Sequence, residues 1–172
     1  MKGIIVITYP GSPWLSDCIA SLEGVSYPVF LCINPKGKSA YDAAAFYYAT
    51  EHNIEEFVVL HDTMEIKDIT LFDKLFELDG NVQLSHLWQM CLGKFTLNRL
   101  TPLPPKPFGK LPAIKFEGTY VRTIKADHKP FPLLEDTSVF VEKHGKKRMV
   151  IENEYILKYK GTWNNDMVGP NE

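Results

Sequence analysis

KGIIVIT, residues Lys2–Thr8, is a continuous run of apolar and β-branched residues near the start of the chain. Such runs are typical of strands that are covered on both faces of a sheet. Two similar runs follow, YPVFLCI at Tyr27–Ile33 and FVVL at Phe57–Leu60. We therefore expect three buried strands in the first part of the chain.

Each of these runs is followed by a segment with helical features. After the first run, Ser12 and Pro13 predict a helix start and Gly24 predicts its stop. A second helix is expected over Ala40–His52, and a third after the capping residue Asp68. The apolar residues at the spacing of one helical face are Leu15, Cys18, Ile19 and Leu22 in the first helix, and Leu71, Phe72, Leu75 and Leu78 in the third.

Three consecutive strand–helix units predict an α/β fold, with a Rossmann-type sheet that is mostly parallel in the N-terminal half and helices on both faces. Ligands of open sheets of this kind bind at the carboxyl ends of the strands. The residues at those ends are Thr8, Tyr9 and Pro10, then Asn34, then His61, Asp62 and Thr63.

The second half has weaker patterns. Its predicted elements, in chain order, are a five-proline loop over Thr101–Pro112, one or two strands within Ala113–Ile124, a short helix over Leu133–His144 ended by Gly145, a strand or strand pair over Met149–Tyr159, and a polar tail from Asn164. We expect one domain over residues 1–163, with residues 164–172 as the tail.

Composition is that of an ordinary globular domain, with 172 residues, 45% hydrophobic and 23% charged. No apolar stretch is long enough to span a membrane, and the N-terminal run has the length of a strand, not of a signal peptide. Cys18, Cys32 and Cys91 form no closely spaced pair, so we expect unpaired thiols and a reducing, cytoplasmic location.

Charge is unevenly spread along the chain. Residues 1–90 hold 5 Lys and Arg against 12 Asp and Glu, and residues 91–172 hold 14 against 9. The second half includes a basic cluster around Gly145, made of Lys143, Lys146, Lys147 and Arg148. This cluster predicts either a surface that meets an anion or a solvated basic turn.

Three stretches carry a resemblance to a known family: ITYPGSPWLSDCIASL, FVVLHDTMEI and PLLEDTSVF. Their order resembles the GT-A-fold nucleotide-sugar glycosyltransferases, family 2 in particular, in a short form. The resemblance implies that residues 1–80 bind a nucleotide sugar, and that residues 81–163, with mixed strands, bind the acceptor and carry the catalytic base.

The resemblance also implies roles for single residues. Asp62 would bind Mg²⁺ or Mn²⁺, since its position matches the acidic DXD motif of the family, although His61-Asp62-Thr63 has only one carboxylate. Asp136 would be the general base and Glu135 its neighbour in an inverting transfer. The residues expected to contact the donor are Thr8, Tyr9, Pro10, Asn34, Asp42, His61, Asp62 and Lys146.

Structural alternatives accompany these roles. Asp62 fits a turn after a strand, Asp42 fits a helix cap, and Glu135 and Asp136 fit the start of a helix. The expected function is transfer from a UDP-type sugar to an acceptor hydroxyl, with a glycan or a hydroxymethylated DNA base of phage type as acceptor. The rivals are a catalytically degenerate GT-A domain that binds a nucleotide or a protein partner, and a nucleotidyltransferase.

Overall fold

The computed structural model describes residues 1–33, 42–79, 81–86, 89–97, 128–130, 137–152 and 154–160. Its elements, in chain order, are β1 (Lys2–Thr8), α1 (Leu15–Ala20), β2 (Val29–Ile33), α2 (Asp42–Glu51), β3 (Glu56–His61), β4 (Met64–Ile66), α3 (Thr70–Glu77), β5 (Asn81–His86), β6 (Gln89–Thr96), β7 (His128–Pro130), β8 (Thr137–Lys143), β9 (Lys146–Glu152) and β10 (Ile156–Lys160).

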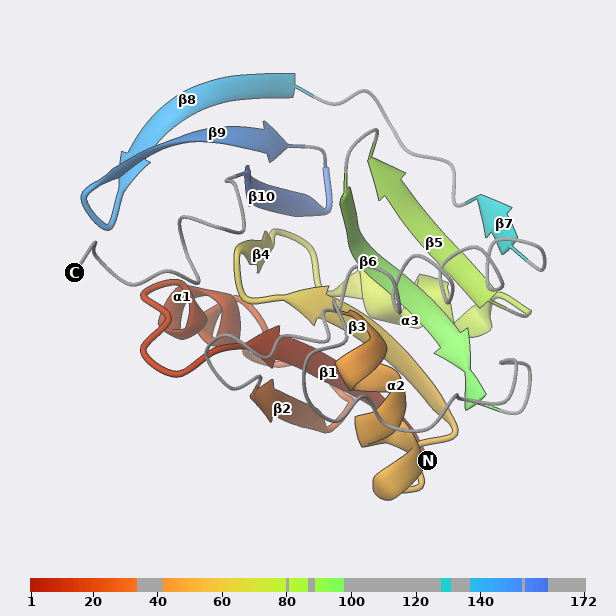
Figure 1. The fold of residues 1–172 in the computed structure, drawn as a ribbon. Coiled ribbons are helices and arrows are strands. Elements are labelled where there is room, and N and C mark those ends of the chain that lie inside the picture. Colours follow the sequence, from red (N-terminus) through yellow and green to blue (C-terminus); the bar gives the residue numbers. More distant parts are fainter. Residues whose placement is uncertain are drawn as a thin grey trace.

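Two sheets organise these elements (Figure 1). The larger has six strands in the order β2-β1-β3-β6-β5-β7, and the smaller has four in the order β4-β10-β9-β8. Strands β2, β1 and β3 are parallel, as expected for the N-terminal half, whereas β6 runs antiparallel to both β3 and β5. The fold is therefore mixed α/β with a mostly parallel central sheet.

Helices cover both faces of the larger sheet, as the sequence predicted. On one face, Ile4 and Val58 belong to a core that also contains residues of α1 and α3. On the other face, Ile5 and Val59 pack in a second core with α2. The alternation of neighbouring residues between two cores is the period-two geometry of a strand buried on both sides.

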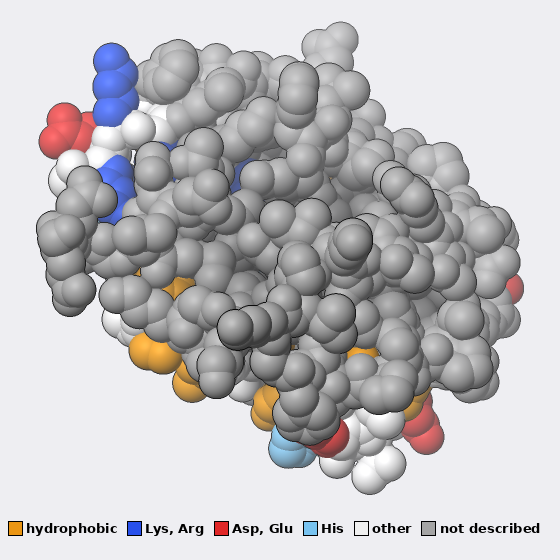
Figure 2. Space-filling view, in the orientation of Figure 1, with side chains coloured by type: hydrophobic (Ala, Val, Ile, Leu, Met, Phe, Trp, Pro, Cys, Tyr) orange, Lys and Arg blue, Asp and Glu red, His pale blue; other side chains and the backbone are white. Residues whose placement is uncertain are grey.

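Strand β2 corrects the expectation of a third fully buried strand. It lies at the edge of the larger sheet, and Val29, Leu31 and Ile33 are exposed, with Ile33 at 58%. Apolar side chains show at the lower margin of Figure 2, where Figure 1 places β2. An apolar composition alone does not tell an edge strand from a central one, because only the neighbouring elements decide this.

The helix predicted over Leu133–His144 is wrong where the structure describes it, since Thr137–Lys143 forms β8. The sequence of β8, TSVFVEK, is rich in β-branched residues. Strand β8 pairs with β9 across a two-residue turn formed by His144 and Gly145. Both turn residues have positive φ, 53° and 68°, which matches the type I′ turn of a tight hairpin. The expected strand pair over Met149–Tyr159 is confirmed as β9 and β10.

Smaller differences concern helix ends and faces. Helix α1 begins at Leu15, because the Ser12 hydroxyl accepts the Trp14 N–H (3.3 Å) in a turn that precedes the helix. In α3, Phe76 is buried while the predicted core residue Leu78 is 37% exposed. The loop Thr101–Pro112, the segment Ala113–Ile124 and the tail from Asn164 lie outside the described residues.

Candidate functional site

The carboxyl ends of β1 and β3 meet through a buried hydrogen bond. Thr8, the last residue of β1, donates from Oγ1 to Oδ2 of Asp62 over 2.7 Å. The two residues are only 3% and 6% exposed. The sequence placed both residues at the ligand-binding edge of the sheet, and the structure brings them together.

The chain changes sheets at Asp62 and Thr63. The Asp62 N–H still donates to the Ile7 carbonyl of β1 (3.0 Å), as in the larger sheet. The next carbonyl, of Thr63, instead accepts the Tyr159 N–H of β10 (2.9 Å), in the smaller sheet. Asp62 and Thr63 therefore lie at the junction of the two sheets. This junction depends on strand β4, which the sequence did not predict.

A buried lysine reaches this junction from the C-terminal half. Lys158 of β10 is 5% exposed and donates from Nζ to the Thr63 hydroxyl. Strand alternation places Lys158 on the same face of β10 as Ile156, which belongs to the core that contains α1 and α3. Lys158 was not among the predicted site residues, and the available signal for it was its position two residues after Ile156 in an apolar strand.

Cys18 of α1 lies among these groups. Its Sγ is 3.9 Å from the carbonyl oxygen of His61. Burial raises the pKa of the Cys18 thiol well above its usual range, and the negative charge of Asp62 raises it further, while the positive charge of Lys158 acts in the opposite direction. Cys18 is therefore a buried, unpaired thiol that stays protonated at neutral pH, in agreement with the free core thiol that the sequence predicted.

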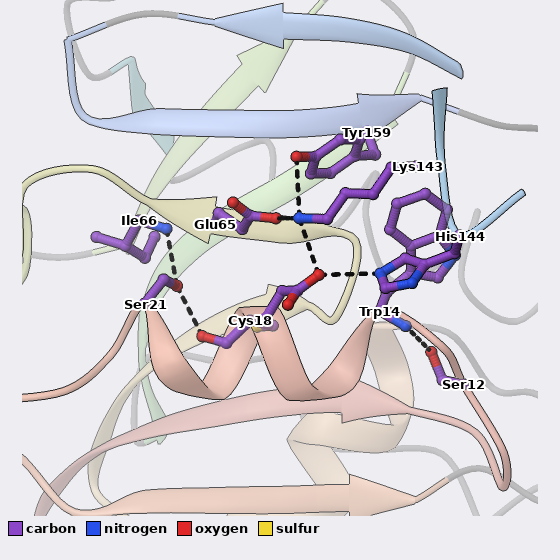
Figure 3. Close-up of polar contacts among 10 residues, drawn as sticks. Ser12, Trp14, Cys18, Ser21, Glu65, Ile66, Lys143, His144 and Tyr159 are labelled. Atoms are coloured by element: carbon purple, nitrogen blue, oxygen red, sulfur yellow. Dashed lines mark hydrogen bonds and ion pairs between the residues drawn. The ribbon is translucent and has the colours of Figure 1, made fainter. Parts of the chain in front are cut away.

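A second polar cluster joins the β8–β9 hairpin to α1 and β4 (Figure 3). The Lys143 ammonium lies 2.8 Å from Oδ2 of Asp17, pairs with Glu65, and donates to the Tyr159 hydroxyl (3.1 Å). His144 Nε2 is 2.9 Å from the same Asp17 oxygen. The arrangement fixes the hairpin turn against the N-terminal half of the chain.

The pKa shifts of this cluster follow from its pairing. Burial opposes the charge of Lys143, but hydrogen bonds to Asp17, Glu65 and Tyr159 outweigh it and raise the pKa of Lys143 above its ordinary value. The hydrogen bond from Lys143 lowers the pKa of Asp17, with a smaller contribution from His144. Both groups are therefore held in their charged forms at neutral pH.

Aromatic packing completes the contact beneath the hairpin. The Trp14 ring is fully buried, with its centroid 4.9 Å from both the His144 and the Tyr159 ring. The Arg148 guanidinium lies 5.9 Å from the Trp14 ring centroid, within the range of a cation–π contact. Trp14, Lys143 and Arg148 thus stabilise the docking of the smaller sheet. The Lys and Arg side chains that show in Figure 2 gather at its upper left, where Figure 1 places the β8–β9 turn.

The other predicted donor contacts are distributed differently. Tyr9 is half-buried and Pro10 is exposed directly after β1. His61 is buried, and strand alternation from Val59 directs it toward the α2 face, away from the core that receives Leu60. Lys146 starts β9 opposite Lys143, at the hairpin turn.

Four of the predicted site residues lie wholly or partly outside the described part of the chain. Asp42 is the first residue of α2, and only its backbone is described. Asn34, Glu135 and Asp136 lie outside the described residues. The roles expected for these four residues therefore stay predictions.

The described residues do not form a divalent-cation site by themselves. Within the described ranges, no group of three His, Cys, Asp or Glu side chains is placed to hold a metal ion. Asp62 is one buried carboxylate, and Thr8 already donates to one of its oxygens. No reaction step is therefore assigned to a metal. No helix in the described part of the chain is long and apolar enough to cross a membrane.

Comparison with known proteins yields little. No protein-family model matches the chain, and a search of curated proteins finds no significant match. One solved structure to which the chain is similar is described as the "crystal structure of a glycosyltransferase involved in the glycosylation of the major capsid of PBCV-1". It shares 11% sequence identity at a TM-score of 0.45, over 76% of this chain and 81% of that chain. A TM-score below 0.5 does not establish a shared fold.

Proposed function

We propose that this protein is a glycosyltransferase that moves a sugar from a nucleotide-diphosphate sugar of UDP type to an acceptor hydroxyl. The observation that carries the proposal is the buried hydrogen bond between Thr8 and Asp62. It joins the ends of two parallel strands at the edge where open α/β sheets bind ligands. The family resemblance implies that Thr8 and Asp62 both contact the nucleotide-sugar donor at this edge of the sheet.

The catalytic part of the proposal is an inverting displacement. Asp136 would take the proton of the acceptor hydroxyl, and Glu135 would position it. The acceptor would be a glycan or a hydroxymethylated DNA base. Mg²⁺ or Mn²⁺ at Asp62 stays a prediction, in which the diphosphate and water would have to supply the other ligands.

The test is a thermal-shift screen of nucleotide sugars, with and without Mn²⁺. A ligand that binds only the folded state increases the free energy of unfolding by mass action, by about 2.7 kcal/mol when its concentration is a hundred times its Kd. The melting temperature rises as a result. We expect one UDP-sugar to raise the melting temperature more than the corresponding free sugar or uridine does. If no nucleotide sugar shifts the transition at millimolar concentration, the proposal is wrong. Comparing the Mn²⁺ and EDTA arms tests the expected metal dependence separately.

A second candidate is a domain that binds a nucleotide without catalysis. It is favoured by the single carboxylate of Asp62, one oxygen of which accepts the Thr8 hydroxyl. Donor hydrolysis or transfer to any acceptor would exclude this candidate, and donor binding without turnover, on a panel of glycans and hydroxymethylated DNA, would support it.

A further inference from the structure

Lys158 is a buried cation with a neutral partner. Its side chain donates to the Thr63 hydroxyl, and no carboxylate of the described residues forms an ion pair with it. Lys94, the other lysine that is buried among the described residues, has an ion pair with Glu56 (3.6 Å) and donates a hydrogen bond to the Leu78 carbonyl (2.9 Å). The two lysines thus differ in what balances their charge.

Burying an ammonium without a compensating charge is unfavourable. An ammonium has three N–H donors, and the Thr63 hydroxyl uses one of those of Lys158. The positive charge and the other two N–H donors of Lys158 are therefore able to interact with an anion. Asp62 lies next to Thr63 in the chain, but it forms no ion pair with Lys158, and its Oδ2 accepts the Thr8 hydroxyl instead.

The position of the Lys158 ammonium indicates which kind of anion would fit beside it. Thr63 lies at the junction of the two sheets, one residue after the carboxylate at the ligand-binding edge. Lys158 reaches this point because it is paired with Met64 in the register of β10 on β4, and its Nζ donates to the Thr63 hydroxyl. An anion with several oxygens can bind the ammonium through one of them and leave the others for the edge of the sheet. Phosphate oxygens have this geometry.

We propose that Lys158 binds the diphosphate of the donor as a fixed cation supplied by the protein. This inference rests on the proposed function for the identity of the anion, but not for its existence. It also gives a reason for the single carboxylate at His61-Asp62-Thr63. A lysine ammonium neutralises part of the diphosphate charge, which reduces the need for a second acidic metal ligand.

The experiment measures binding in EDTA by calorimetry, with inorganic pyrophosphate, UDP and uridine as probes. Wild-type protein should bind pyrophosphate and UDP without any divalent cation, and should bind uridine more weakly than UDP. Lys158→Met, which keeps the length of the side chain and removes the charge, should lose at least tenfold in affinity for both phosphate probes. Lys158→Arg should keep most of it. The control Lys67→Met removes an exposed charge paired with Glu152 and should bind as wild type.

Thermal stability without ligand separates binding from structure. If the Lys158 ammonium is buried without a balancing charge in the ligand-free protein, Lys158→Met should melt at the wild-type temperature or above it, because the substitution removes that charge. Should that variant fail to fold, Lys158→Gln takes its place. Wild-type affinity in the charge-free variant would overturn the proposal, as would an absence of pyrophosphate and UDP binding to wild type. If both probes bind but no nucleotide sugar does, the glycosyltransferase proposal fails and the anion site stands.

Discussion

Replacing Thr8 by Val tests the central contact of the site. Val has nearly the shape of Thr, so the packing at the end of β1 is preserved while the donor to Asp62 Oδ2 is removed. A hydrogen bond to a charged group contributes about 1.5–3 kcal/mol to stability, and the lost donor leaves a buried carboxylate oxygen unsatisfied. For a chain of this length, each kcal/mol lowers the melting temperature by roughly 2–4 °C. The expected decrease is therefore about 3–12 °C.

The assay is thermal denaturation followed by circular dichroism, with urea denaturation for the free energies and Thr50→Val as the matched control. Thr50 is exposed on α2 and donates to the neutral carbonyl of Phe46 over 2.9 Å. Its replacement should cost less than about 1 kcal/mol. Adding Asp62→Asn to Thr8→Val should make the two changes less than additive, because they share one hydrogen bond. Equal costs for Thr8→Val and Thr50→Val, or strict additivity with Asp62→Asn, would refute a buried charge-assisted bond.

Three further predictions concern the hairpin and catalysis. Gly145→Ala should destabilise the protein by about 1–2 kcal/mol in urea denaturation, since φ is +68° and no atom lies near the added Cβ, so the cost is that of the backbone alone. Lys143 lowers the folded-state pKa of Asp17, so this pair stabilises the protein above pH 3.8 and its contribution is lost as the pH falls through the lowered value. Asp17→Asn should therefore flatten the pH dependence of the urea midpoint between about pH 5 and pH 2, and an unchanged profile would contradict the pairing. Asp136→Asn should bind donor normally but lose turnover by roughly 10²–10⁴-fold, with Glu135→Gln less affected, and full activity of the first variant would assign the proton to another group.

The parallel strands of the N-terminal half were predictable because their signals are local. Lys2–Thr8 and Phe57–Leu60 are apolar on both faces, and helices from both faces bury them in the structure. The same criterion failed for β2, whose apolar sequence suggested a central strand. Exposure of an edge strand depends on which strand pairs with it, and that information is not contained within Tyr27–Ile33.

The C-terminal half was harder to predict because its elements depend on pairing. Thr137–Lys143 forms a strand through its hairpin with β9, although it was predicted as part of a helix. Strand β4 has three residues and is defined by its pairing with β10, which is distant in sequence. Lys158 shows the same limitation for the site. Its proximity to Thr63 follows from the register of β10 on β4, in which Lys158 is paired with Met64.

The charge asymmetry of the chain acquires a specific meaning in the fold. Acidic residues of the first half meet basic residues of the second half where the two sheets join: Lys143 pairs with Asp17 and Glu65. These ion pairs give Lys143 a structural role, which differs from both explanations left open for the cluster around Gly145, a surface that meets an anion or a solvated basic turn. Lys158 differs because it reaches the same junction, is more deeply buried, and has a hydroxyl as its partner. If every basic residue served only to dock the smaller sheet, a carboxylate would be expected beside this one as well. The positive charge left over at the carboxyl end of β3 is therefore the part of the asymmetry that points to an anionic ligand.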